Sequence, residues 1–137
     1  MLDRIRKFVV TIVLGPDTLA AVVGAATWAV PAGFKGRVLS AALSLRTTGT
    51  TSGATTVDVN KATGGAAPAT ILSTPLSIAF GATVKSVKAK VAGGTGEPNG
   101  VPVDGDNGDT ITVDVDAVPG VASAGGQLYM EVAVTDV

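Results

Sequence analysis

Hydrophobic and polar residues alternate strictly in several parts of this chain. In the segment 110–116, isoleucine and valine occupy every second position, and threonine or aspartate fills the positions between them. Successive side chains of a β-strand point to opposite faces, so this pattern predicts a strand with Ile111, Val113 and Val115 facing a core. The same period of two predicts strands over residues 36–46, 57–60, 86–91 and 128–134.

The segment 36–46 has hydrophobic residues on both faces of its predicted strand. Strict alternation groups Leu39 with Leu43 and Leu45, and it places Val38 on the opposite face together with serines. Because the side-chain period of a strand is two, Val38 and Leu39 are expected to point in opposite directions.

The first thirty residues give a less regular pattern. The hydrophobic run 8–14 is rich in β-branched residues and ends at a Gly-Pro-Asp turn, which predicts a first strand or an N-terminal arm rather than a secretory signal. A membrane-spanning helix needs about 20 apolar residues, so none is expected here. Residues 18–26 fit either one or two helical turns or a strand of small residues. Trp28 and Val30 then indicate a strand that ends at Pro31.

Segments rich in glycine, threonine, serine and proline separate these runs, as turns and loops do. Pro75 splits two short hydrophobic runs and is expected at a bend or a sheet edge, because proline cannot donate to a central ladder. The chain therefore predicts an all-β fold, an antiparallel β-sandwich of about eight or nine short strands. A jelly roll is favoured over an immunoglobulin-like arrangement. We expect one domain over 1–137, with a sandwich core over 27–137 and a possible arm or strand over 1–26.

Composition narrows the possible chemistry. Hydrophobic residues make up 46 % of the 137 positions and aromatic residues only 4 %, so the core must be built mainly from aliphatic side chains. The chain contains neither cysteine nor histidine. This composition removes thiolate and imidazole metal ligands, and also the Ser–His and Cys–His arrangements of nucleophilic catalysis. We therefore expect a protein that is not an enzyme and that carries no cofactor.

Charge is divided unevenly along the chain, although the net charge is only -1. Residues 1–92 hold ten basic and three acidic residues, whereas residues 93–137 hold eight acidic residues and no basic one. Such a division has two interpretations. Strands from the two halves can lie side by side and neutralise each other within one domain, or an acidic edge of one subunit can meet a basic edge of the next.

Clustered carboxylates raise the question of a metal site. Asp104, Asp106 and Asp109 are weak calcium candidates, because their spacing does not match the EF-hand pattern. Aspartate, asparagine and glycine are also ordinary turn residues, so we expect a polar turn that leads into the next strand and no bound metal.

Two further charged groups have surface interpretations. Asp114 and Asp116 share one face of a predicted strand, about 6.5–7 Å apart, and no neighbour is expected to raise the pKa of either one. Lys85, Lys88 and Lys90 form a basic strip without interleaved aromatic residues, so binding of nucleic acid is not expected. Both groups are predicted to be solvent-exposed or to contact a partner.

The order of these motifs resembles small β-sandwich proteins from the virions of tailed bacteriophages, both capsid decoration (cement) proteins and jelly-roll domains of tail fibres. The resemblance covers about residues 27–135. It rests on a Pro-Ala-Gly turn at 31–33, on the runs GRVLSAALSL at 36–45 and TVDVNK at 56–61, on TILST at 70–74, and on GDTITVDVD at 108–116.

This resemblance implies a structural protein on the capsid surface of a virion, made in the host cytoplasm. Its partners would be the major capsid protein and further copies of itself in a homotrimer, with no nucleic acid and no membrane. The alternative that it implies is a tail- or fibre-associated module that binds a receptor or a glycan. The residues expected at partner contacts are Arg4, Arg6, Lys7, Phe8, Lys85, Lys88, Lys90, Asp114 and Asp116.

Overall fold

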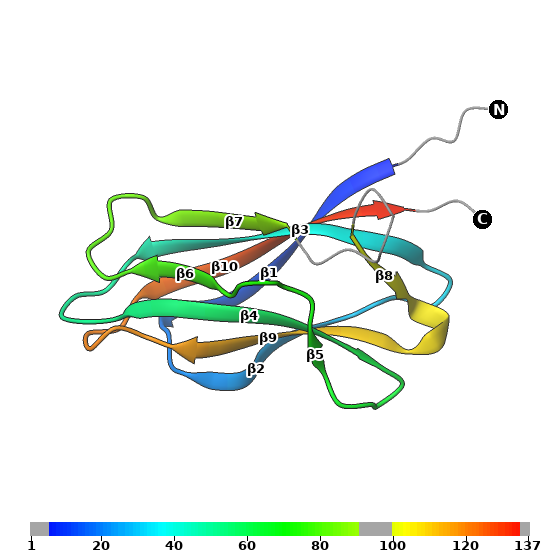
Figure 1. The fold of residues 1–137 in the computed structure, drawn as a ribbon, viewed down its shortest axis with the longest axis horizontal. Helices are drawn as coiled ribbons and strands as arrows, with labels where there is room; N and C mark the ends of the chain where they lie inside the picture. Colours follow the sequence, from blue (N-terminus) through cyan, green and yellow to red (C-terminus); the bar gives the residue numbers. More distant parts are fainter. Residues whose placement is uncertain (1–5, 91–99, 135–137) are drawn as a thin grey trace.

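The structure is a computed structural model that describes residues 6–90 and 100–134. Two antiparallel sheets pack face to face (Figure 1). Sheet A contains β1 (Arg6–Thr18), β3 (Lys35–Thr47), β7 (Ser86–Lys90), β8 (Val101–Asp104) and β10 (Ala124–Val134). Sheet B contains β2 (Val22–Ala29), β4 (Ala54–Thr63), β5 (Ala69–Thr70), β6 (Leu76–Ala79) and β9 (Asp109–Ala117). A single 3-10 turn, η1 (Gly105–Asn107), joins β8 to β9.

The strand order is that of a jelly roll. The strand β1 pairs with β10, β2 with β9, β3 with β7 and β8, and β4 with β5 and β6. When this long antiparallel ribbon is rolled up, β10 also pairs with β3, and β9 with β4. The resulting sheets read β1-β10-β3-β7 and β2-β9-β4-β5, and rolled ribbons of this kind are double Greek keys. The predicted all-β antiparallel sandwich is confirmed.

The described residues form ten strands, but these fill only eight positions in the two sheets. At one edge of sheet A, β8 pairs with the first part of β3 and β7 pairs with its second part. At one edge of sheet B, β5 and β6 share the length of β4 in the same way, and Pro75 lies between them. The prediction of eight or nine strands is therefore close, because a split edge adds strands without widening a sheet.

The N-terminal segment is part of both sheets. The strand β1 pairs with β10 from Arg6 to Thr18, and β2 pairs with β9. Of the two possibilities for residues 18–26, the strand forms from Val22 onward rather than the helical turns, residues 19–21 connect β1 to β2, and the register of β2 is irregular between Val22 and Ala26. No helix of the described residues is long and apolar enough to cross a membrane.

Aliphatic residues fill the space between the sheets, as the low aromatic content requires. Ile111, Val113 and Val115 are buried, which confirms the alternation predicted for 110–116. The alternation predicted for 36–46 is wrong at one point: Val38 is fully buried, while Leu39 is only half-buried. The register between β3 and β10 shifts there, because Leu39 is an extra residue in a β-bulge, and a bulge resets the period of two.

Candidate functional site

The predicted contact residues lie in three separate regions. Lys7 and Phe8 begin β1, at one edge of sheet A, whereas Lys85, Lys88 and Lys90 lie next to or on β7, at the other edge. Asp114 and Asp116 lie on β9 in sheet B. Arg6 is the first residue of β1, and Arg4 lies outside the described residues. The structure therefore gives these residues no common site.

Phe8 belongs to an aromatic cluster at the margin of the core. Its ring meets the ring of Phe34 edge-on, with 5.7 Å between centroids, and Phe34 meets Trp28 edge-on at 6.2 Å. Edge-to-face contacts of this kind add to the energy of burial. Trp28 is half-buried against the core, so it serves packing rather than an exposed platform on which a sugar ring could stack.

Ion pairs join the basic and acidic parts of the chain within one domain. Lys7 contacts Glu131 at 3.7 Å, Lys35 contacts Asp104 at 3.9 Å, and Lys61 contacts Asp109 at 3.6 Å. In each pair the cation comes from the first 92 residues and the anion from the remainder. This pattern supports the first of the two interpretations of the charge division, neutralisation inside the sandwich.

The carboxylates of the 104–109 turn hold the turn together. The Asp104 carboxylate accepts a hydrogen bond from the Asp106 amide at 2.9 Å, and Asp106 accepts one from the Gly33 amide at 2.8 Å. Asp109 is buried and accepts hydrogen bonds from Thr63 Oγ1 at 2.7 Å and from the Asp104 amide at 2.8 Å. Across the described ranges, no group of three or more acidic side chains is arranged to hold a metal ion.

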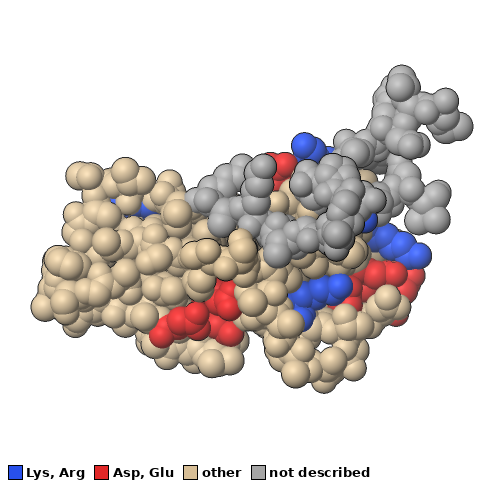
Figure 2. Space-filling view, viewed as in Figure 1, with Lys and Arg blue, Asp and Glu red and all other residues tan. Residues whose placement is uncertain are grey.

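An acidic patch, defined by Asp58, Asp114 and Asp116, lies on the outer face of sheet B (Figure 2). Asp58 of β4 stands directly opposite Asp114 of β9. Hydrogen bonds fix the orientation of the Asp58 and Asp114 carboxylates. Asp114 accepts hydrogen bonds from the Gly24 amide and from Asn60 Nδ2. Asp58 accepts a hydrogen bond from Thr70 Oγ1.

The expectation that no neighbour raises an aspartate pKa here is wrong. Partial burial raises the pKa of Asp116, and the negative charges of Asp58 and Asp114 raise it further. The strand pairing that brings Asp58 to this face joins residues more than fifty positions apart in the chain, so spacing along one strand could not reveal it.

Replacing Asp116 by asparagine is expected to stabilise the protein slightly at pH 7, by less than about 1 kcal/mol because the side chain is exposed. A carboxyl group with a raised pKa in the folded state favours folding when protonated. Its unfavourable contribution therefore appears as the pH rises above about 4, the ordinary aspartate value. Urea denaturation should show a gain at pH 7 that disappears at pH 3. The same substitution at the exposed Asp17, away from the patch, should give no gain at either pH.

Four loops meet at the end of the sandwich opposite the start of β1 and the end of β10 (Figure 1). This loop end consists of residues 19–21, 48–53, 80–85 and 118–123. Thr50 and Val121 exchange two backbone hydrogen bonds of 2.9 Å, and the Phe80 amide donates to Gly53 at 3.1 Å. The Leu19 amide donates to Ser123 at 2.9 Å. Backbone hydrogen bonds thus connect all four loops into one preformed surface.

Gly49 explains how closely these loops approach one another. Its φ of +78° lies in the left-handed region, and a Cβ atom at this position would lie 2.4 Å from the Val121 carbonyl oxygen. Only glycine fits both conditions. The close approach of loops 48–53 and 118–123 therefore depends on this residue.

The loop end exposes hydrophobic side chains that the sequence analysis did not single out. Phe80, Val84 and Val121 have exposed fractions of 46, 69 and 56 %, and Val22 and Val23 at the start of β2 are also exposed. Lys85 is the only charged residue in the four loops, and this end of the molecule shows almost no charge in Figure 2. The sequence signal that could have indicated these exposed hydrophobic residues is a lone hydrophobic residue inside a loop rich in glycine and serine.

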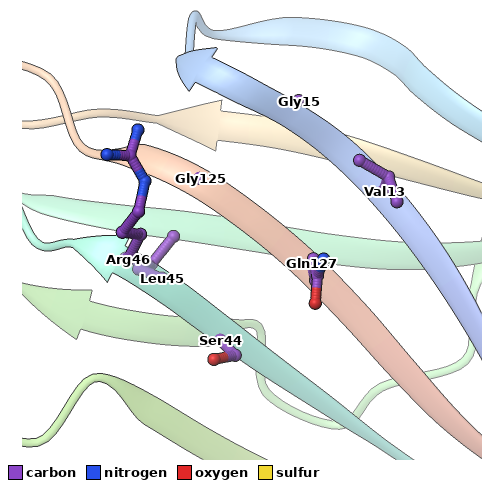
Figure 3. A pocket seen from close by; sticks show the side chains of 7 residues that line it. All are labelled: Val13, Gly15, Ser44, Leu45, Arg46, Gly125 and Gln127. Carbon is purple, nitrogen blue, oxygen red and sulfur yellow. The ribbon is translucent and has the colours of Figure 1, made fainter.

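A shallow groove of about 380 Å³ lies on the outer face of sheet A (Figure 3). Its residues come from β1, β3 and β10, and Arg46 is the only charged residue among them. The aliphatic part of the Arg46 side chain packs directly on Gly125. A Cβ atom on residue 125 would lie 2.5 Å from the Cβ atom of Arg46. Arg46 and a few polar groups line this groove.

No known protein-family model matches this chain, and no curated protein matches it either.

Proposed function

We propose that this protein is a structural protein of a tailed-phage virion, a decoration (cement) protein that binds the outside of the head and stabilises it. The observation that carries the proposal is the jelly-roll order of the two sheets in a small sandwich. This architecture is one that virus capsids use repeatedly. The motif order from 31–33 to 108–116 supports the same proposal through its resemblance to phage virion proteins.

The surface that meets the head is, in this proposal, the loop end. Its exposed hydrophobic residues offer area that gains free energy when water is excluded. Because hydrogen bonds already hold the four loops together, little conformational entropy is lost on binding. The near absence of charge means that few ionic groups would have to be desolvated.

The partners follow from the same proposal. The major capsid protein receives the loop end, and copies of this chain associate with one another. The resemblance implies a homotrimer for the copies bound to a head. In this proposal the protein acts on the surface of the virion. A tail- or fibre-associated module that binds a receptor or a glycan is the alternative.

Co-sedimentation tests this function. Purified protein is mixed with empty heads of the cognate phage and, separately, with isolated tails. We expect saturable binding to heads and none to tails, and heads that carry the protein should rupture at a higher temperature than bare heads. Binding to tails alone would support the fibre-associated alternative, and binding to neither particle would refute the proposal.

A further inference from the structure

The free edge of β1 differs from every other sheet edge in the described residues. Strand edges normally carry a lysine, a proline, a bulge or a break, which prevents pairing with a second sheet. The edge formed by β7 and β8 contains Lys88, Lys90 and Pro102; the edge formed by β5 and β6 is broken at Pro75; and β2 has an irregular register between Val22 and Ala26. The stretch 8–13 of β1 has no such device, and the register of β1 shifts only after Val13.

This stretch also exposes hydrophobic side chains. Val9 and Val13 point to the outer face of sheet A with exposed fractions of 59 and 56 %, and Phe8 on the inner face is 37 % exposed. At the C-terminal side, the register shifts between Val13 and Gly15, so regular pairing ends at Val13. The result is a short, uncharged and apolar edge with its backbone groups available on one side.

The sequence of the edge is complementary to itself. If two copies run antiparallel with Thr11 opposite Thr11, Val10 lies opposite Ile12 and Val9 opposite Val13. Phe8 and Leu14 flank these pairs, and Leu14 lies where the register of β1 shifts. Cross-strand pairs of β-branched and aromatic residues stabilise antiparallel sheets, and so do pairs of threonines. Lys7 falls opposite Gly15, so no like charges meet.

We propose that two copies of this protein pair through β1, antiparallel and centred on Thr11, so that the two A sheets become one continuous sheet. The contact is isologous and closes at two copies. Pairing would satisfy the free backbone groups of the edge and bring Val9 and Val13 into contact with Val13 and Val9 of the second copy. It would also extend the core over Phe8, which lies at its margin. The inference does not depend on the proposed binding to heads.

Sedimentation analysis of the purified protein over a range of concentrations tests this dimer. We expect a species of twice the 13.4 kDa chain mass. Thr11→Lys would place two ammonium groups opposite each other at the two-fold axis, and Val13→Lys would charge the same edge. Each should weaken dimerisation about tenfold or more. The control Val84→Lys adds the same charge at another exposed valine, next to β7 at the opposite edge of sheet A, and should leave the dimer intact.

Cysteine cross-linking tests the register, since the natural chain has no cysteine. Thr11→Cys should form an intermolecular disulfide on mild oxidation, because opposed residues of antiparallel strands lie about 4.5–5.5 Å apart. Val9→Cys alone should not, because the two thiols would stand four residues apart, about 13 Å along the strand. A mixture of Val9→Cys and Val13→Cys proteins should cross-link as a heterodimer.

Three results would overturn the inference. They are a monomer at all concentrations, an oligomer that Thr11→Lys and Val13→Lys leave unchanged, or a trimer in which Thr11→Cys forms no disulfide. Circular dichroism of each variant establishes that the sandwich is folded. Because the masses are measured without heads, failure of the dimer is distinguishable from failure of head binding.

Discussion

Replacing Asp109 by alanine is expected to lower the free energy of unfolding by about 2–4 kcal/mol. The Asp109 side chain is only 3 % exposed, and its carboxylate receives the Thr63 hydroxyl, the Asp104 amide and the Lys61 ammonium group. Alanine would leave the Thr63 hydroxyl and the Asp104 amide, both donors of part-buried hydrogen bonds, without their acceptor. Urea denaturation at pH 7 measures the loss. Asp106→Ala, in the same turn but exposed, is the matched control and should cost less than about 1 kcal/mol.

The effect of Asp109 should depend on pH. Burial alone would raise the pKa of Asp109, but hydrogen bonds from Thr63 and the Asp104 amide, with the charge of Lys61, outweigh burial and lower it. A lowered pKa means that the ionised group stabilises the fold above its unfolded value, about 3.9. This contribution is lost as the pH falls through the lower folded value. Asp109→Asn should therefore show a flatter stability profile below pH 4 than the natural protein, and equal slopes would contradict this role.

Replacing Leu128 by alanine is expected to cost about 3–5 kcal/mol, a large part of the stability of a domain of this size. Leu128 is fully buried in β10, with Ile12 of β1 on one side and Leu43 of β3 on the other. In a core with so few aromatic residues, these aliphatic side chains supply most of the packing. Alanine would leave a cavity at the centre of sheet A.

Thermal and urea denaturation measure this loss. Val23→Ala is the matched control: it also shortens an aliphatic side chain on a strand, but Val23 is 84 % exposed and should change stability by no more than about 0.5 kcal/mol. A loss below about 1 kcal/mol at Leu128 would mean that the two sheets do not pack as described.

Much of the fold could be predicted from the sequence, because period-two alternation is a local signal. The strands β9 and β10 follow it closely, and Leu128, Met130 and Val132 are buried as expected. Alternation fails where local geometry changes: the bulge at Leu39 moves Val38 into the core. A bulge depends on pairing with a partner strand, which the sequence of β3 alone does not specify.

The surfaces were harder to predict, because they depend on pairs of distant strands. Asp58 and Asp114 become neighbours only when β4 pairs with β9, and the raised pKa of Asp116 follows from that pairing. Exposed Val84 and Val121 are not distinguishable from core valines by residue type. The lysines at 85, 88 and 90 and the aspartates at 114 and 116 were expected at partner contacts, and they lie on different sheets of the sandwich.

The two interaction surfaces inferred for this protein are spatially separate. The loop end gathers connections from both sheets, whereas the free edge of β1 runs along the side of sheet A. A dimer formed through β1 therefore leaves the hydrophobic side chains of Phe80, Val84 and Val121 free to meet another protein.

The central claim is that the loop end attaches this protein to a phage head, and a binding titration of empty heads tests it most directly. The natural protein, the double variant Val84→Asp/Val121→Asp and the double control Ala66→Asp/Ala67→Asp are compared. The control adds the same two negative charges to the exposed 64–68 loop, between β4 and β5. We predict saturable binding by the natural protein and the control, and at least about tenfold weaker binding by the double variant. Equal binding by all three, or no binding by the natural protein, would contradict the claim.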